Sequence, residues 1–198
     1  MDYTVLNNNV KMPLLGFSVP DANESEREKE MLNALRLGYR SFDLTEGSVK
    51  FPVGDMLYRH GIGRKELFLA IRLAEPLSGY RDTKEGLQRV LEWLQLDFID
   101  LLLLPESAND CRGCYRAMEE AYEDGWVRAI GVTDFPSTKL GELCEAAEIP
   151  PSVHQVTWQG VDMTEPLLSC LARYDIQMEI RSLDGFTFFL PSFIHHSI

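Results

Sequence analysis

A regular alternation of strand-like and helix-like segments constrains the fold of this chain more than any other feature of its sequence. Seven short apolar segments have the pattern of β-strands, and a helical pattern follows each of the first six. The strands are expected at 14–18, 39–43, 67–73, 98–104, 127–132, 152–156 and 176–180, and the helices at 24–37, 53–60, 83–94, 111–123, 137–147 and 165–174. Units of this kind with short connections predict an α/β protein with a parallel sheet.

The segment 98–104 is apolar without alternation, as expected for a parallel strand that is buried on both faces. A short hairpin precedes the first unit, with strands at 3–6 and 10–12 and an Asn7-Asn8-Asn9 turn, because Asn tolerates positive φ. Periodicity alone does not separate an open, doubly wound sheet from a barrel. No Gly-x-Gly-x-x-Gly follows an early strand, which argues against a dinucleotide-binding open sheet.

The composition excludes several classes of function. The 198 residues carry a formal net charge of -12, which argues against nucleic acid or an anionic membrane surface as a partner. No signal peptide and no apolar stretch of ~20 residues is visible, so we expect no membrane span. Four cysteines in a chain of this length are not a disulfide framework, which favours a cytoplasmic location.

Several motifs follow one another in the order found in a known family. They are Gly-Tyr-Arg-Ser-Phe-Asp at 38–43, and the segments 7–17, 94–101, 117–119, 128–135 and 155–156. From Tyr3 to about Ile180 the chain resembles the aldo-keto reductases, TIM barrels that reduce small carbonyl compounds with NADPH. The resemblance implies a (β/α)8 barrel that is incomplete, with about seven βα units at 1–184 and the last unit missing, followed by a non-family apolar tail at 185–198.

The family uses an Asp, a Tyr, a Lys and a His as its catalytic set. The resemblance assigns the acid to Asp43, at the end of the second strand. The proton-donating Tyr falls near Ser48, the Lys falls at Arg72, and the His falls at Pro105. A serine hydroxyl is too weak an acid to replace a phenol, and we expect Arg72 to form an ion pair with Asp43. The resemblance therefore identifies a carbonyl oxidoreductase, while these replacements predict impaired catalysis.

The resemblance also implies which residues bind NADPH. The pair that holds the nicotinamide amide in the family corresponds to Thr133 and Asp134, and the family's Gln is retained as Gln155. The aromatic ring that stacks on the nicotinamide corresponds to Arg181. We expect no metal, because the adjacent His195 and His196 cannot share one face and a zinc ligand set is absent.

The end of the chain leaves alternatives open. Without a last βα unit, the first and seventh strands would be open edges, through which the protein could self-associate. Residues 186–190 could instead supply a substitute strand or a dimer contact. The tail could also be the readthrough or frameshift product of a damaged gene, since its phenylalanines have no polar counterbalance.

Two other functions are consistent with the sequence. Cys111 and Cys114 form a Cys-x-x-Cys pair at the start of an expected helix, where a low thiol pKa would permit redox chemistry. Alternatively, the chain is a non-catalytic relative, that is, a binding or interaction pseudoenzyme or a truncated gene product.

Overall fold

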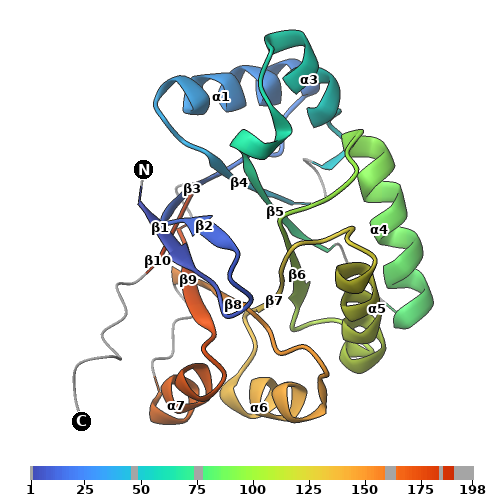
Figure 1. Ribbon diagram of the computed structural model, residues 1–198, viewed down its shortest axis with the longest axis vertical. Coiled ribbons are helices and arrows are strands. Elements are labelled where there is room, and N and C mark those ends of the chain that lie inside the picture. The colour runs from blue at the N-terminus through green and yellow to red at the C-terminus, as the bar shows by residue number, and fades with distance from the viewer. Residues whose placement is uncertain (1, 46–48, 74–77, 159–163, 183–184, 190–198) are drawn as a thin grey trace.

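The computed structural model describes residues 2–45, 49–73, 78–158, 164–182 and 185–189. At its centre is a closed eight-stranded barrel with the strand order β10-β3-β4-β5-β6-β7-β8-β9 (Figure 1). Seven of the strands run parallel to one another: β3 (Leu15–Ser18), β4 (Ser41–Leu44), β5 (Phe68–Arg72), β6 (Leu101–Pro105), β7 (Ile130–Thr133), β8 (Val153–Thr157) and β9 (Gln177–Arg181). The barrel and its seven parallel strands confirm the prediction from the sequence.

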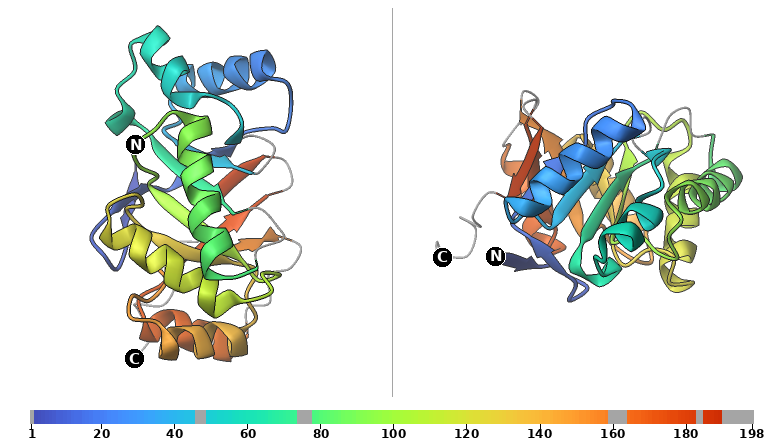
Figure 2. Two further views of the ribbon diagram at one scale, coloured as in Figure 1. Left: turned by 90° about the vertical axis from the view of Figure 1, so that its right-hand side faces the viewer. Right: turned by 90° about the horizontal axis from the view of Figure 1, so that it is seen from above.

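Helices lie around the outside of the barrel (Figure 2). They are α1 (Glu24–Arg36), α3 (Val53–His60), α4 (Tyr80–Leu94), α5 (Cys111–Glu123), α6 (Ser137–Ala146) and α7 (Glu165–Arg173), with a short 3-10 helix at Arg64–Glu66. Asn23 caps α1, since its side chain accepts a hydrogen bond from the backbone N–H of Glu26. Within the described part of the chain, no helix has the length and apolar character needed to cross a membrane.

The barrel is closed by β10 (Phe186–Phe189), which runs antiparallel to both of its neighbours, β3 and β9. Thr187 lies opposite Gly16 on one side and opposite Arg181 on the other. A Cβ atom at position 16 would overlap the Thr187 hydroxyl, so the close approach of β10 requires a glycine there.

This closure corrects two expectations from the sequence. The prediction of open edges on the first and seventh strands is wrong for the described residues, because β10 lies between β3 and β9. The boundary at residue 184 does not separate barrel from tail, since residues 186–189 belong to the barrel. Of the alternatives for the end of the chain, the structure shows the substitute strand, formed by residues 186–189. Self-association was expected to use the open edges of the first and seventh strands, and β10 occupies both edges.

The N-terminal hairpin closes one end of the barrel, the end at which the parallel strands begin. Its strands are β1 (Tyr3–Val5) and β2 (Lys11–Pro13), and Asn9 in the turn has a φ of 66°, as the asparagine run predicted. The Asn7 amide donates hydrogen bonds to the carbonyls of Pro151 (3.0 Å) and Tyr174 (3.2 Å), which precede β8 and β9. These hydrogen bonds hold the hairpin against the end of the barrel at which β8 and β9 begin.

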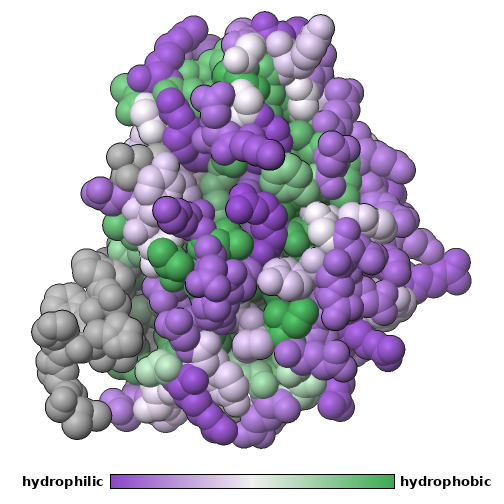
Figure 3. Space-filling model, viewed as in Figure 1, coloured by the Kyte–Doolittle hydropathy of each residue, from purple (hydrophilic) through white to green (hydrophobic). Residues whose placement is uncertain are grey.

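Alternate residues of each strand face the inside of the barrel, and they divide it into two layers. Near the hairpin the interior is apolar; this apolar layer consists of Phe68, Ala70, Leu101, Leu103, Ala129 and Val153, with Leu6 and Met12 from the hairpin. A separate apolar core, including Phe42 and Ile71, fills the space between barrel and helices. The outer surface is mostly hydrophilic on the face drawn in Figure 3, in keeping with the high charge.

Candidate functional site at the carboxyl end of the barrel

Four polar side chains lie close together inside the barrel, on the side of the apolar layer that faces the carboxyl ends of the strands. We call Asp43, Arg72, Gln155 and Glu179 the polar layer; they come from β4, β5, β8 and β9. Because the carboxyl ends of parallel strands meet at one end of a barrel, these residues are brought together from positions far apart in the sequence.

Arg72 joins three strands within the polar layer. Its Nη2 donates to Asp43 Oδ2 at 3.2 Å and to Gln155 Oε1 at 2.8 Å. Asp43 is 2% exposed and the Arg72 side chain is 17% exposed. The ion pair expected between these two residues is therefore present, and it is nearly shielded from water.

Burial dominates the electrostatics of Asp43. Removal from water raises the pKa of its carboxyl, while the positive charges of Arg72 and Arg181 oppose that rise. Burial and repulsion by Arg72 lower the pKa of the Arg181 guanidinium. Two guanidiniums thus share this end of the barrel with a carboxyl group that burial has weakened as an acid.

Glu179 belongs to the polar layer and was missed by the sequence analysis. Its Oε2 accepts a hydrogen bond from Gln155 Nε2 at 2.9 Å. Burial, followed by repulsion from Asp43, raises its pKa from 4.5 to about 7. The signal was present in the sequence, because Glu179 precedes Arg181 by two residues and must share its face of the strand.

Thr133 and Asp134, the predicted amide-binding pair, lie at the end of β7, and Asp134 forms hydrogen bonds with Thr157 at the end of β8. Asp134 adopts a positive φ of 59°, which turns its carboxylate toward the next strand. Its Oδ1 accepts from the Thr157 backbone N–H at 2.8 Å, and its Oδ2 accepts from the Thr133 hydroxyl at 3.1 Å. Both side chains therefore have partners within the protein.

The residues present do not fit the nicotinamide pocket that the resemblance implies. The Gln155 amide is engaged on both sides, by Arg72 and by Glu179. Asp134 supplies a carboxylate that already accepts hydrogen bonds in place of a free amide, and Arg181 supplies no aromatic ring.

Among the described residues, the side chains that interact with Asp43 include no tyrosine hydroxyl. The chain has no tyrosine between positions 43 and 50, and the predicted site residue Ser48 lies outside the described residues. Tyr58, on α3, is 87% exposed. Pro105, to which the resemblance assigns the histidine, ends β6 and lies beside Thr133, with no side-chain donor.

The Cys-x-x-Cys motif does not have the properties of a redox pair. Cys111 lies at the start of α5 as predicted, with Asp110 capping the helix by accepting from the Gly113 N–H. Burial raises the pKa of the Cys111 thiol, which is the opposite of what a reactive thiolate needs. Cys114 is fully buried.

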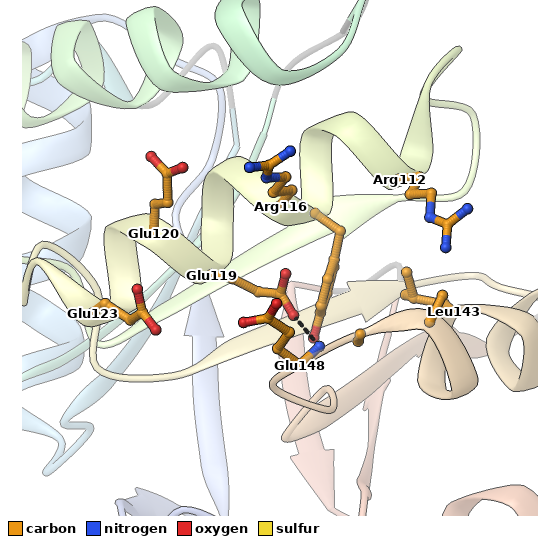
Figure 4. A pocket seen from close by; sticks show the side chains of 10 residues that line it. Arg112, Arg116, Glu119, Glu120, Glu123, Leu143 and Glu148 are labelled. Atoms are coloured by element: carbon orange, nitrogen blue, oxygen red, sulfur yellow. Dashed lines mark hydrogen bonds between the residues drawn. The ribbon is translucent and has the colours of Figure 1, made fainter.

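A groove on the outer helical layer lies apart from this end of the barrel (Figure 4). It has a volume of about 530 Å³ and lies between α5 and the end of α6. Glu119 accepts hydrogen bonds from the backbone N–H groups of Glu148 and Ile149, and the Tyr115 hydroxyl donates to the Ile149 carbonyl. These bonds hold the segment after α6 against α5, and no residue of the polar layer lines the groove.

Comparisons with known proteins agree with this architecture. The model of the aldo/keto reductase family matches residues 16–183. A glyoxal reductase of Bacillus subtilis is 38% identical over 159 residues, which cover 78% of this chain and 57% of the relative. The chain thus spans little more than half of that relative's length.

Solved structures show the same barrel. A Brucella melitensis aldo/keto reductase superposes with a TM-score of 0.81 at 27% identity, covering 90% of this chain and 70% of the other. A Bombyx mori aldo-keto reductase in complex with NADP superposes with a TM-score of 0.77 at 21% identity, covering 90% and 65%. The match of the family model over most of the chain is decisive, and the chain belongs to the aldo/keto reductase family.

Proposed function

We propose that this protein is an aldo/keto reductase in which NADPH-dependent reduction of small carbonyl compounds is strongly impaired. The observation that carries the proposal is the pairing of Arg72, to which the resemblance assigns the family's lysine, with both Asp43 and Gln155. A guanidinium remains charged at all working pH values and differs from an ammonium group in shape. It therefore cannot reproduce the Lys–Asp pair that tunes the family's tyrosine.

The missing proton donor supports the same proposal. Carbonyl reduction needs a hydride at the carbon and a proton at the oxygen. No tyrosine stands between positions 43 and 50, and Pro105 replaces the histidine that helps to orient the carbonyl. Loss of one acid–base group costs roughly 10²–10⁴ in rate. Without both groups we expect a loss of at least that size.

The relatives indicate which substrates to test. The name of the Bacillus subtilis relative points to glyoxal, and a relative from Pseudomonas putida, 33% identical, is named a morphine 6-dehydrogenase. Glyoxal is the smaller compound and needs the fewest specific contacts. It is therefore the first substrate to offer this protein.

The test is the oxidation of NADPH in the presence of glyoxal, measured for three proteins. They are the native chain, the variant Asp43→Asn, and the triple variant Ser48→Tyr/Arg72→Lys/Pro105→His. We expect the native chain and Asp43→Asn to be equally slow, and the triple variant to be faster by about 10² or more. A native rate equal to that of the Bacillus relative, and sensitive to Asp43→Asn, would refute the proposal.

A second candidate is a non-catalytic binding protein that no longer uses the cofactor. It is favoured by the hydrogen bonds of Gln155 and Asp134, which are satisfied within the protein. Titration with NADPH, followed by tryptophan fluorescence, separates the two. Saturable micromolar binding supports the impaired reductase, whereas no binding up to millimolar NADPH supports the non-catalytic protein.

A further inference from the structure

Two cysteines outside the barrel form a pair that carbonyl reduction does not use. Cys144 lies on α6 and Cys170 lies on α7, and these two helices pack side by side (Figure 1). Both cysteines carry free thiols. Cys144 is buried in the apolar core between the barrel and the helices, whereas Cys170 packs against that core and is only partly buried. The pair therefore lies apart from the polar layer.

The two thiols are in direct contact. The Cys144 thiol donates a hydrogen bond to the Cys170 sulfur. A disulfide forms only between cysteines that approach each other closely, because its bond lengths and angles allow little variation. Since the two sulfur atoms already touch across the interface of two helices, this pair meets the first condition for a disulfide.

The other cysteine pair has a different arrangement. Cys111 and Cys114 lie on the same helix, α5, and Cys114 is fully buried. The Cys111 thiol donates to the backbone carbonyl of Ala108 at 3.2 Å rather than to the Cys114 sulfur. The contact between two thiols thus distinguishes the pair on α6 and α7 from the Cys-x-x-Cys motif.

The surroundings of the pair determine which thiol reacts first. Burial raises the pKa of both thiols, and that of Cys144 reaches about 12. At Cys170 the hydrogen bond from Cys144 and the positive charge of Arg173 oppose the rise in pKa, while the charge of Glu145 adds to it. The thiolate is the reactive form of cysteine. Cys170, which is also the more accessible of the two, therefore reacts first, and its reaction at neutral pH is slow.

A structural zinc ion does not suit this pair. Zinc in structural sites takes four protein ligands. Within the described part of the chain, no group of three or more cysteine, histidine, aspartate or glutamate side chains could hold a metal ion. The two sulfurs are better suited to a bond with each other.

We propose that Cys144 and Cys170 are a modification site, at which a hydroperoxide converts the two thiols into a disulfide that joins α6 to α7. The Cys170 thiolate attacks a peroxide oxygen, the O–O bond breaks, and a sulfenic acid forms while the leaving oxygen takes up a proton. The Cys144 sulfur then attacks the Cys170 sulfur, and the hydroxyl group leaves as water with the Cys144 proton. With hydrogen peroxide, two thiols lose two electrons and two protons in total, and the peroxide becomes two water molecules.

The disulfide would stabilise the fold. It closes a loop of the chain that contains β8, and such a cross-link reduces the entropy of the unfolded chain. We expect the Tm to rise by about 5–10 °C. The cross-link involves no residue of the polar layer, so this proposal and the proposed function can fail independently.

The test is peptide mapping of the native protein after incubation with hydrogen peroxide at pH 8 and alkylation of the remaining thiols. Cleavage after Glu145 and Glu148 places Cys144 and Cys170 in different peptides. We expect these two peptides to be joined, with a mass lower than their sum by two hydrogen atoms, and to separate on reduction with dithiothreitol. Recovery of Cys170 as sulfinic acid beside an alkylated Cys144, or of both cysteines alkylated, would overturn the proposal.

Two variants complete the experiment. Cys170→Ser should abolish both the joined peptides and the rise in Tm on oxidation. Cys111→Ser is the matched control and should retain both. An equal rise in Tm for the native protein and Cys170→Ser, or its loss in Cys111→Ser, would contradict the proposed stabilisation by this disulfide. If Cys170→Ser does not fold, the peptide map of the native protein still decides whether the disulfide forms.

Discussion

The polar layer and the apolar layer occupy the same barrel but are stabilised in different ways. In the apolar layer, side chains such as Leu103 are fully buried and need only fill space. In the polar layer, buried groups such as Asp43 and Gln155 depend on specific partners. Apolar packing is lost in proportion to the volume removed, whereas a buried charge without its partner carries its whole desolvation cost.

This difference explains how a barrel of this kind can be retained when the polar residues inside it are replaced. The apolar layer has no part in chemistry, so it is constrained by packing alone. Arg72 preserves a positive charge beside Asp43, which satisfies the buried carboxyl without the family's lysine. The polar layer therefore depends on charge pairing, and it will respond to mutation and to pH differently from the apolar layer.

The largest effect is expected in the apolar layer. Leu103→Ala should lower the free energy of unfolding by about 3–4 kcal/mol, because Leu103 is fully buried inside the barrel and its removal leaves a cavity. Urea unfolding at pH 5.5 and pH 7 should give the same loss at both values. Leu37→Ala, at a position that is 80% exposed, is the matched control and should change stability by less than about 0.5 kcal/mol. A loss that depends on pH would contradict the separation of the layers.

A smaller effect is expected from breaking the ion pair of the polar layer. Arg72→Met should cost about 2–3 kcal/mol at pH 7, below the value for a fully buried pair because the Arg72 side chain is 17% exposed. The double variant Asp43→Asn/Arg72→Met should recover much of this loss, since it removes the uncompensated charge. Urea unfolding of the two variants measures the difference. Equal stability of both would mean that Asp43 does not depend on Arg72.

The sequence was sufficient for the seven parallel strands and for the Asp43–Arg72 pair. Regular alternation of strand and helix patterns defined the strands, and the family motifs placed both residues at the carboxyl ends of neighbouring strands. The antiparallel direction of β10 could not be read from Phe186–Phe189, because a strand of four residues carries no information on its partners. It depends on Gly16, which leaves space for Thr187.

The remaining parts of the site depend on contacts that strand periodicity does not encode. The link from Asp134 to Thr157 requires a positive φ at a non-glycine residue, which sequence patterns rarely reveal. Glu179 could have been identified from its spacing to Arg181, but its pairing with Gln155 and its repulsion by Asp43 arise only when the barrel closes.

The smallest effect, and the one most specific to the polar layer, is expected at Glu179. Its pKa is raised from 4.5 to about 7, so the folded protein holds this proton more tightly than the unfolded chain does. The resulting stabilisation is complete below pH 4.5 and is lost as the pH rises through about 7. Because one pKa unit corresponds to about 1.4 kcal/mol, the contribution should fall by roughly 1–2 kcal/mol between pH 5.5 and pH 7.

Glu179→Gln should remove this part of the pH dependence, because a glutamine can still accept the hydrogen bond from Gln155 but does not ionise. Urea unfolding of the native chain and the variant at both pH values measures the change. Glu92→Gln, on an exposed face of α4, is the matched control and should follow the native chain. If Glu179→Gln also follows the native chain, Glu179 is ionised throughout this range, and burial does not raise its pKa as we expect.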